Sequence, residues 1–182
     1  MKNPFPALTT PRLVLRELQA KDAPRLVELL RDKEISRWFA WDLSNATARE
    51  ERSFIRGARK AYKAGRGLAW AICERENGAV IGFIGLDSID SANKSAVATF
   101  WLGKAYRGKG CMTEAFHAVL RHGFNALHLN RVSAGHLEGN VPSSRVQQKC
   151  GLRCEGTHRQ KVYKNGRFID LVEYAILREE YK

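Results

Sequence analysis

The stretch at residues 106–115 (YRGKGCMTEA) constrains the fold more than any other part of this chain. It follows an apolar run at residues 96–102 that is typical of a strand, and it leads into a helical pattern. Gly108 and Gly110 let the backbone turn tightly between the two elements. The first amide groups of the following helix then lack intrahelical acceptors, and with the helix dipole they favour a bound anion. The sequence therefore predicts a site for the diphosphate of a ligand, flanked by basic side chains.

Two familiar phosphate-binding loops do not match this stretch. The chain contains no G-x-x-x-x-G-K-[ST] pattern, so it lacks the phosphate loop of nucleoside triphosphatases. Position 113 is threonine, so the G-x-G-x-x-G pattern of dinucleotide-binding folds lacks its third glycine. We therefore expect a phosphate-bearing ligand of another class.

The composition is that of one globular domain. A chain of 182 residues with 44% hydrophobic residues can bury a core of ordinary size, and we expect a single domain over residues 1–182. No apolar run approaches the ~20 residues that span a bilayer, and residues 1–6 form no apolar leader. These features predict a cytoplasmic protein without a membrane partner. The four cysteines show no zinc-ligand spacing, so we expect no metal.

The net charge of +12 raises the question of nucleic acid. The basic residues are scattered along the chain, and no zinc finger, RNP signature or basic heptad region occurs. The excess would suit an enzyme that works at the ribosome, an acidic peptide substrate, or a polyanionic ligand. The sequence therefore does not favour nucleic acid as a direct partner; contact with RNA would be expected only as part of the ribosome.

Hydrophobic periodicity predicts a mixed α/β order without repeats or a long linker. The clearest helix start is Thr47, because Thr47 and Glu50 match a capping box. Asp22 is a second candidate cap. The expected strands lie at 11–17, 68–73, 80–86, 95–102 and 131–138, with hairpins turning at Asn77-Gly78 and Asn165-Gly166. The expected helices begin at Asp22 and Thr47 and span 111–126 and 143–150.

Several segments, taken in order, resemble one known family. Arg107 and Gly110 fit the pattern [RQ]-x-x-G-x-[GA], with Met112 at the last position, and this resembles the acyl-CoA loop of the GNAT N-acetyltransferase superfamily. Further segments are similar to its RimJ/RimL-like branch, the ribosomal-protein N-terminal acetyltransferases. They are residues 10–16, 98–102, 140–152, 155–156 and 165–170.

The resemblance implies a fold and a ligand. The fold would be α/β (mixed α+β), with a central, mostly antiparallel sheet of about seven strands that splays between strands 4 and 5 and is flanked by helices. The ligand would be acetyl-CoA, with its pantetheine arm between strands 95–102 and 131–138. The residues implied for binding are Trp101, Leu102, Gly103, Arg107, Gly108, Lys109, Gly110, Cys111, Met112, Thr113, Asn140, Ser143, Arg145 and Lys149.

The catalytic groups are less clear from the sequence. Many relatives place a tyrosine seven residues after the asparagine, but here this position is Gln147, which has no titratable proton. The resemblance implies Ser143 instead as the donor of a proton to the leaving sulfur, although a helix N-cap would also explain this serine. His136 and Glu138 are candidate bases on one strand. Further candidates on the last hairpin are Glu155, His158, Asp170 and Glu173.

The absence of a dominant base bears on the acceptor. An α-amine with a pKa of about 7.7–8.0 is roughly 10–15% neutral at pH 7, whereas a lysine at about 10.4 is almost entirely charged. The sequence therefore favours an enzyme that acetylates the N-terminal α-amine of a protein or peptide, possible ribosomal targets included. Acetylation of a small amine, an acyl-CoA-binding module without turnover, and a homodimer stay open. The resemblance implies that the acceptor groove includes Arg37, Trp38, Phe39 and Trp41, with plain core packing as the equal alternative for Trp38 and Phe39.

Overall fold

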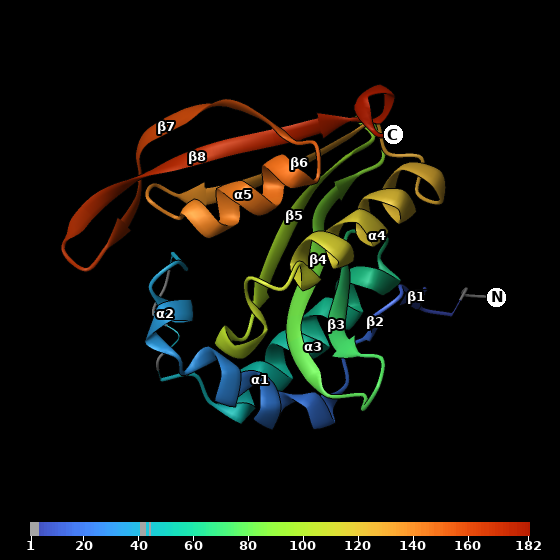
Figure 1. Ribbon diagram of the computed structural model, residues 1–182, viewed down its shortest axis with the longest axis vertical. Helices are drawn as coiled ribbons and strands as arrows, with labels where there is room; N and C mark the ends of the chain where they lie inside the picture. Colours follow the sequence, from blue (N-terminus) through green and yellow to red (C-terminus); the bar gives the residue numbers. More distant parts are fainter. Residues whose placement is uncertain (1–3, 41–42, 44) are drawn as a thin grey trace.

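The protein, described here by a computed structural model, is built on one eight-stranded sheet (Figure 1). The structure describes residues 4–40, 43 and 45–182. The strand order is β1-β2-β3-β4-β5-β6-β8-β7, and every neighbouring pair is antiparallel except β5 and β6. The strands are β1 (Leu8–Thr9), β2 (Leu13–Glu17), β3 (Leu68–Glu74), β4 (Val80–Asp90), β5 (Ser95–Leu102), β6 (Arg131–Leu137), β7 (Arg153–Lys164) and β8 (Arg167–Leu177).

Helices cover both faces of this sheet. They are α1 (Ala23–Leu30), α2 (Lys33–Ser36), α3 (Ala48–Lys63), α4 (Cys111–Asn125) and α5 (Val141–Lys149). Figure 1 shows α4 and α5 in front of the sheet and α3 behind it. Phe116 and Val119 of α4 belong to the larger core cluster, whereas Ile55 of α3 and Leu26 of α1 belong to a second one. The two clusters correspond to the two faces of the sheet.

The mixed, mostly antiparallel sheet flanked by helices is confirmed. It has one strand more than expected because the two-residue β1 pairs with β2. The short helix α2 was also not foreseen, since four residues are too few to show periodicity. That residues 1–182 form a single domain stays a prediction.

Local signals located most of the elements. The Thr47 side chain accepts from Glu50 N–H, and the Glu50 carboxylate accepts from Thr47 N–H, as the capping box predicted. The two-residue turn between β7 and β8 places Asn165 and Gly166 at positive φ, 50° and 77°. Both angles suit the type I′ turn that an Asn-Gly pair favours.

Two predicted caps are wrong. Asp22 occupies the N-cap position of α1, but its side chain caps nothing there. Its carboxylate accepts instead from the guanidinium of Arg16 at 2.7 and 2.8 Å. Asp22 is buried, and a buried carboxylate that lacks a counterion costs more free energy than an uncapped helix end. The cap of α5 is Asn140, whose side chain accepts from Ser143 N–H at 3.2 Å, so Ser143 lies within the first turn.

The parallel strands β5 and β6 part along their length. Their pairing runs from Ser95 with Arg131 to Val97 with Ser133 and then ends, although β5 continues to Leu102 and β6 to Leu137. The result is a V-shaped opening in the middle of the sheet. We call this opening, between residues 98–102 of β5 and 134–137 of β6, the V. Its apex is the level of Val97, where the pairing ends.

Within the described residues, no helix is both long and apolar enough to cross a bilayer.

Candidate active site

The loop before α4 presents free backbone donors beside the open end of the V. Gly110 is the N-cap of α4 with φ at 78°, and no side chain caps this helix. Gly108 has φ at 74°, with no atom within 4 Å of where a Cβ would stand. The first intrahelical bond runs from Glu114 N–H to Gly110 O at 3.0 Å. The amides of residues 111–113 therefore precede the first intrahelical bond and point out of the helix end, as an anion site requires.

Arg12 supports this loop, and sequence reasoning missed it. Its guanidinium donates to Lys109 O at 2.8 Å, and its Nη2 lies 3.4 Å from where a Gly110 Cβ would stand. The Glu114 carboxylate holds Arg12 through Nε at 2.6 Å and also accepts from Thr10 Oγ1 at 2.7 Å. Burial alone would raise the pKa of Glu114, but the hydrogen bonds from Thr10 and Arg12 outweigh it and lower this pKa. Glu114 is therefore charged, and the positive charge of Arg12 balances it beside the helix N-terminus.

Arg107 is turned into the protein. Its Nε donates to Leu102 O at 3.1 Å, and its Nη1 donates to Glu34 O at 3.3 Å. Burial lowers the pKa of this guanidinium. In this conformation Arg107 ties the loop to the end of β5 and to α2, while the exposed Lys109 remains the basic side chain at the turn.

The backbone of β5 offers only alternate residues to the V. Gly103 N–H donates to Ile81 O at 2.9 Å, so this amide faces β4. Because peptide groups alternate along an antiparallel strand, Trp101 also faces β4, whereas Phe100 and Leu102 face the V. Phe100, which the sequence did not single out, therefore joins Leu102 as the candidate partner of an extended ligand arm.

The candidate acid Ser143 lies at the start of α5 with its hydroxyl partly engaged. Gln147 Nε2 donates to Ser143 Oγ at 3.1 Å, which leaves the hydroxyl proton of Ser143 free to be donated elsewhere. Gln147 is fully buried. The residue that replaces the expected tyrosine thus positions the serine rather than supplying a proton itself.

Of the two candidate bases on or just after β6, His136 lies beside Gln147, which in turn contacts Ser143. His136 is buried against the Tyr174 ring, with ring centroids 5.5 Å apart, and burial lowers its pKa. The Gln147 amide lies close enough to oppose this shift in part. Even so, His136 Nδ1 and Gln147 Oε1 have no hydrogen-bond partner among the described residues. Glu138 is exposed, one residue beyond the end of β6.

Further charged residues, most of them predicted, lie around the rim. Lys104, Arg145 and Lys149 are exposed basic side chains, the first beside the loop and the others on α5. On the opposite face of the sheet, His158 of β7 and Glu173 of β8 are 2.6 Å apart beside a surface hollow. Glu155 forms an ion pair with Arg131, and Asp170 accepts from Gln160 N–H.

The segment after α2 approaches the open end of the V on the β6 side. Arg37 stacks 4.5 Å above the Trp38 ring, and the tip of that ring lies 3.9 Å from where a Gly139 Cβ would stand, just after β6. Lys164 of β7 is buried and donates to three carbonyl oxygens here, those of Ser36, Arg37 and Phe39. Trp38 and Phe39 are half-buried, and Trp41 lies outside the described residues.

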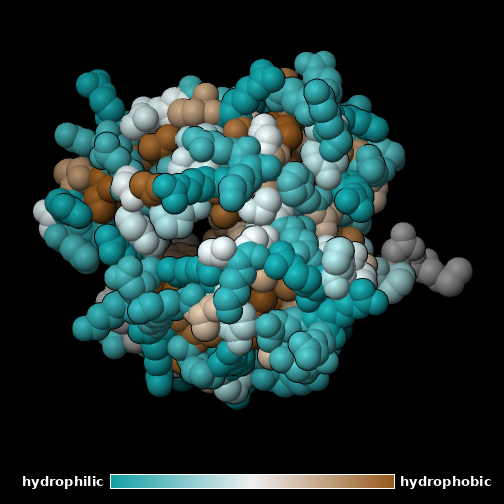
Figure 2. Space-filling view, in the orientation of Figure 1, coloured by the Kyte–Doolittle hydropathy of each residue, from teal (hydrophilic) through white to brown (hydrophobic). Residues whose placement is uncertain are grey.

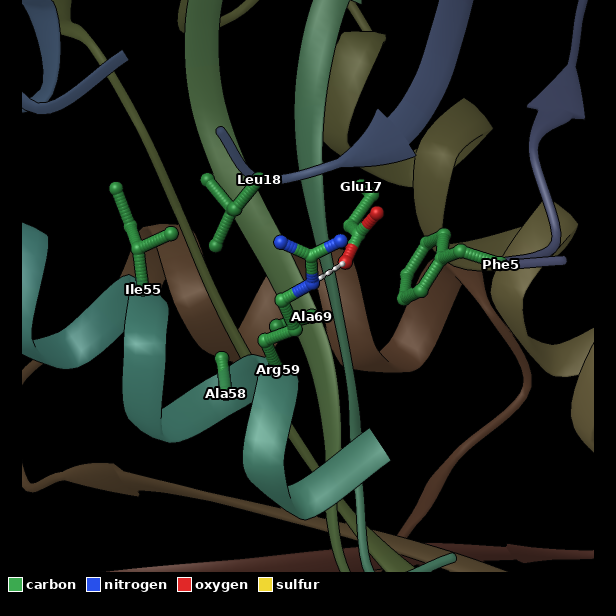
Figure 3. Close-up of a pocket in the computed structure, with 7 residues that line it drawn as sticks. All are labelled: Phe5, Glu17, Leu18, Ile55, Ala58, Arg59 and Ala69. Carbon is green, nitrogen blue, oxygen red and sulfur yellow. Dashed lines mark ion pairs between the residues drawn. The ribbon is translucent and has the colours of Figure 1, made fainter. Parts of the chain in front are cut away.

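The surface is hollowed where these elements meet. Figure 2 shows the hollow between the part formed by α5, β7 and β8 and the part formed by α1 and α2. Another pocket lies behind the sheet between α3 and β2 (Figure 3). An ion pair between Glu17 and Arg59, 3.3 Å apart, crosses it above apolar side chains. Neither this pocket nor the hollow at His158 and Glu173 is lined by residues of the loop before α4.

A splayed parallel strand pair with a glycine loop and free helix amides at its open end defines an acyl-CoA acetyltransferase architecture. Comparison with known proteins agrees with this class. Residues 12–153 match the model of the acetyltransferase (GNAT) domain. The chain belongs to this GNAT N-acetyltransferase family.

Individual relatives cover nearly the whole chain. Over 182 residues it is 31% identical to YdaF of Bacillus subtilis, provisionally named as a ribosomal N-acetyltransferase, with 98% of each chain covered. It is 23% identical to the [ribosomal protein uS5]-alanine N-acetyltransferase of Escherichia coli, which covers 93% of this chain and 89% of that one. A structure titled RimL, ribosomal L7/L12 alpha-N-protein acetyltransferase, in complex with coenzyme A, superposes with a TM-score of 0.87 at 21% identity. It covers 94% of this chain and 98% of that one, and at this identity it supports the fold alone.

Proposed function

We propose that the protein transfers the acetyl group of acetyl-CoA to the N-terminal α-amine of a protein or peptide, a ribosomal protein being the favoured target. The observation that supports acetyl-CoA as the acetyl donor is the V beside the uncapped N-terminus of α4. Acetyl-CoA would supply an activated thioester, and the residues of this chain would bind, orient and move protons around it.

Each group at the site then has a task. The amides of residues 111–113 would bind the diphosphate, with Lys109 beside them and Arg12 holding the turn. The V-facing peptide groups of Phe100 and Leu102 would pair with the pantetheine arm. Ser143, held by Gln147, would donate its hydroxyl proton toward the leaving sulfur. The exposed Arg145 and Lys149 remain candidates for the ribose phosphate.

An α-amine suits this site better than a lysine side chain. The buried His136, with its lowered pKa, is a weak proton acceptor, and an amine that loses its proton easily makes the smallest demand on this or any other base of the site. The pKa difference between a lysine and an α-amine is about 2.5, which corresponds to roughly 3.4 kcal/mol. The names of the relatives and the charge of +12 point to the same class of acceptor.

An acceptor screen tests the proposal. Peptides with a free N-terminus and varied first residues should release free thiol from acetyl-CoA, and mass spectrometry should locate the acetyl group on the α-amine. The same peptides with a blocked N-terminus and an internal lysine are the matched controls, and a polyamine and an amino sugar represent small amines. Turnover confined to the small amines would refute the proposed acceptor.

Replacing Ser143 by alanine should lower kcat by about 10-fold with little change in the affinity for CoA. The expected loss is modest because a thiol with a pKa of about 8.5 is already a fair leaving group. Steady-state kinetics at saturating peptide would measure it. Ser144→Ala is the matched control, since Ser144 is the next residue of α5 and its hydroxyl contacts Tyr174 instead. Equal kcat values for the Ser143 variant and the unmodified enzyme would remove the acid role.

A further inference from the structure

The apex of the V is open on the sheet face that carries α1 and α3. On β5, Ala96 and Ala98 are 2% and 3% exposed because they point toward α4. Val97 and Thr99 point the other way, and both are exposed. Across the apex, Gly135 of β6 is also exposed on this side, although the Leu171 side chain lies 3.4 Å from where a Gly135 Cβ would stand. Solvent therefore reaches the β4–β5 side of the apex on this face, at Val97 and Thr99.

One carboxylate of β4 lies at this apex. Asp87 is the register partner of Val97, which is the last residue of β5 that still pairs with β6. Its Oδ2 accepts from Thr99 Oγ1 at 2.5 Å. The pair of side chains thus stands at the level where the two strands part.

The surroundings make Asp87 an unusual surface carboxylate. Solvent reaches it, yet the neighbouring protein atoms desolvate the carboxyl group in part and raise its pKa. The Thr99 hydroxyl opposes this shift without cancelling it. On the other side, Oδ1 lies 3.8 Å from where a Gly67 Cβ would stand. No charged group contributes to the shift among the described residues.

We propose that Asp87 is the catalytic residue that accepts the proton of the acceptor amine, with Thr99 positioning its carboxylate. The inference rests on the proposed acetyl transfer in the V, but not on which amine is the acceptor. With a diphosphate at α4 and an extended arm between β5 and β6, the acyl end would point toward the apex.

The other titratable groups near the V are less well placed to accept the proton of the amine. Ser143 and His136 lie on the α5 face of the sheet, where the leaving sulfur would be protonated. Glu173, the register partner of Gly135, shares the face of Asp87, but it is engaged with His158 at 2.6 Å. Acid and base would thus act from opposite faces, so that the amine enters on one side and the thiol leaves on the other.

The proton and electron balance closes without another reactant. The acceptor ammonium gives one proton to the Asp87 carboxylate, which later releases it to solvent. The freed lone pair forms the N–C bond to the thioester carbonyl carbon, and the C–S bond breaks with its electron pair on sulfur. The second proton of the amine replaces the one that Ser143 gives to sulfur. The products are the amide, the free thiol and one proton.

The test is Asp87→Asn, which keeps the size of the side chain and removes its basicity. We expect kcat/KM to fall about 100-fold at pH 7 for whichever amine the enzyme acetylates, within the range of general base catalysis. The deficit should shrink toward pH 9, where the acceptor is already neutral, and the affinity for CoA by calorimetry should not change. Asp90→Asn on the same strand is the control, because its carboxyl only accepts hydrogen bonds within a turn.

Thr99→Val provides an independent readout. Loss of the hydroxyl removes a group that lowers the pKa of Asp87, so the acidic break in the pH–kcat/KM profile should move to higher pH. Activity is lost as pH falls through the Asp87 pKa, because the protonated carboxyl cannot accept a proton. An unmoved break would contradict the assignment.

The possible failures are distinguishable. Tight CoA binding by the unmodified enzyme without turnover of any amine would refute the acetyl transfer itself, and the role of Asp87 with it. Turnover by the unmodified enzyme that Asp87→Asn leaves within about threefold, far below a base effect, would refute the role of Asp87 alone. An equal loss at every pH accompanied by weaker CoA binding would also refute it. So would a larger loss in Glu173→Gln.

Discussion

Gly82→Ala is expected to destabilise the protein by about 3 kcal/mol or more, because the added methyl group would overlap the backbone of β5. A Cβ at this position would lie 2.4 Å from Trp101 O, 2.6 Å from Leu102 Cδ2 and 3.0 Å from Leu102 Cα. Backbone in the middle of a sheet cannot move aside without loss of its ladder bonds. The midpoint of thermal unfolding should therefore fall by about 6–12 °C.

The same substitution should weaken the binding of the acetyl donor. Gly82 is the register partner of Leu102, so the displaced part of β5 is the part that lines the V. Calorimetric titration with CoA at a temperature where the variant is still folded would measure this loss. Gly57→Ala is the control: no atom lies within 4 Å of the new methyl group, which should stabilise α3 by about 0.5–1 kcal/mol. A Gly82 variant as stable as the unmodified protein would contradict the tight β4–β5 packing.

Lys164→Met is expected to cost about 2–4 kcal/mol, since hydrogen bonds from a charged donor are worth roughly 1.5–3 kcal/mol each and their loss leaves buried carbonyls unpaired. The Lys164 ammonium reaches the carbonyl oxygens of Ser36 and Phe39 at 2.8 and 2.6 Å. It joins the β7–β8 hairpin to the segment after α2, which approaches the open end of the V on the β6 side. Loosening this segment should raise the KM for the acceptor and leave the affinity for CoA almost unchanged.

The matched control for this prediction is Lys161→Met. Lys161 lies on the same strand but is exposed, so its replacement should change the free energy of unfolding by less than about 0.5 kcal/mol. Chemical denaturation of both variants, combined with KM values for one peptide, separates the two effects. If the two variants had the same free energy of unfolding and the same KM, the hydrogen bonds from Lys164 to the segment after α2 would contribute to neither stability nor acceptor binding.

Local sequence signals were enough to locate most elements of the fold. The Asn165-Gly166 turn, the Thr47–Glu50 box and the glycine loop before α4 each depend on residues only a few positions apart. The hydrogen bonds and backbone angles that define them involve only these neighbouring residues. The splay of β5 from β6 came from the family resemblance, because no local pattern records where a parallel pair ends.

The rest of the site depends on contacts between distant residues. Arg12 and Glu114 are 102 positions apart, and Lys164 and Ser36 are 128 apart, so no periodicity reveals them. Asp87 was missed because its environment depends on the register of β4 with β5. The cap of α5 could have been found, since Asn140 is followed by Val141 and Pro142 at the first helical positions, a common arrangement after a polar cap.

A structure with acetyl-CoA bound tests the central claim most directly. The account predicts the diphosphate within hydrogen-bond distance of the amides of residues 111–113, the pantetheine arm between β5 and β6, and the acetyl carbon at the apex of the V. Asp87 should lie on one side of that carbon and Ser143 on the other. A diphosphate bound away from the N-terminus of α4, or an acetyl group outside the V, would contradict the account.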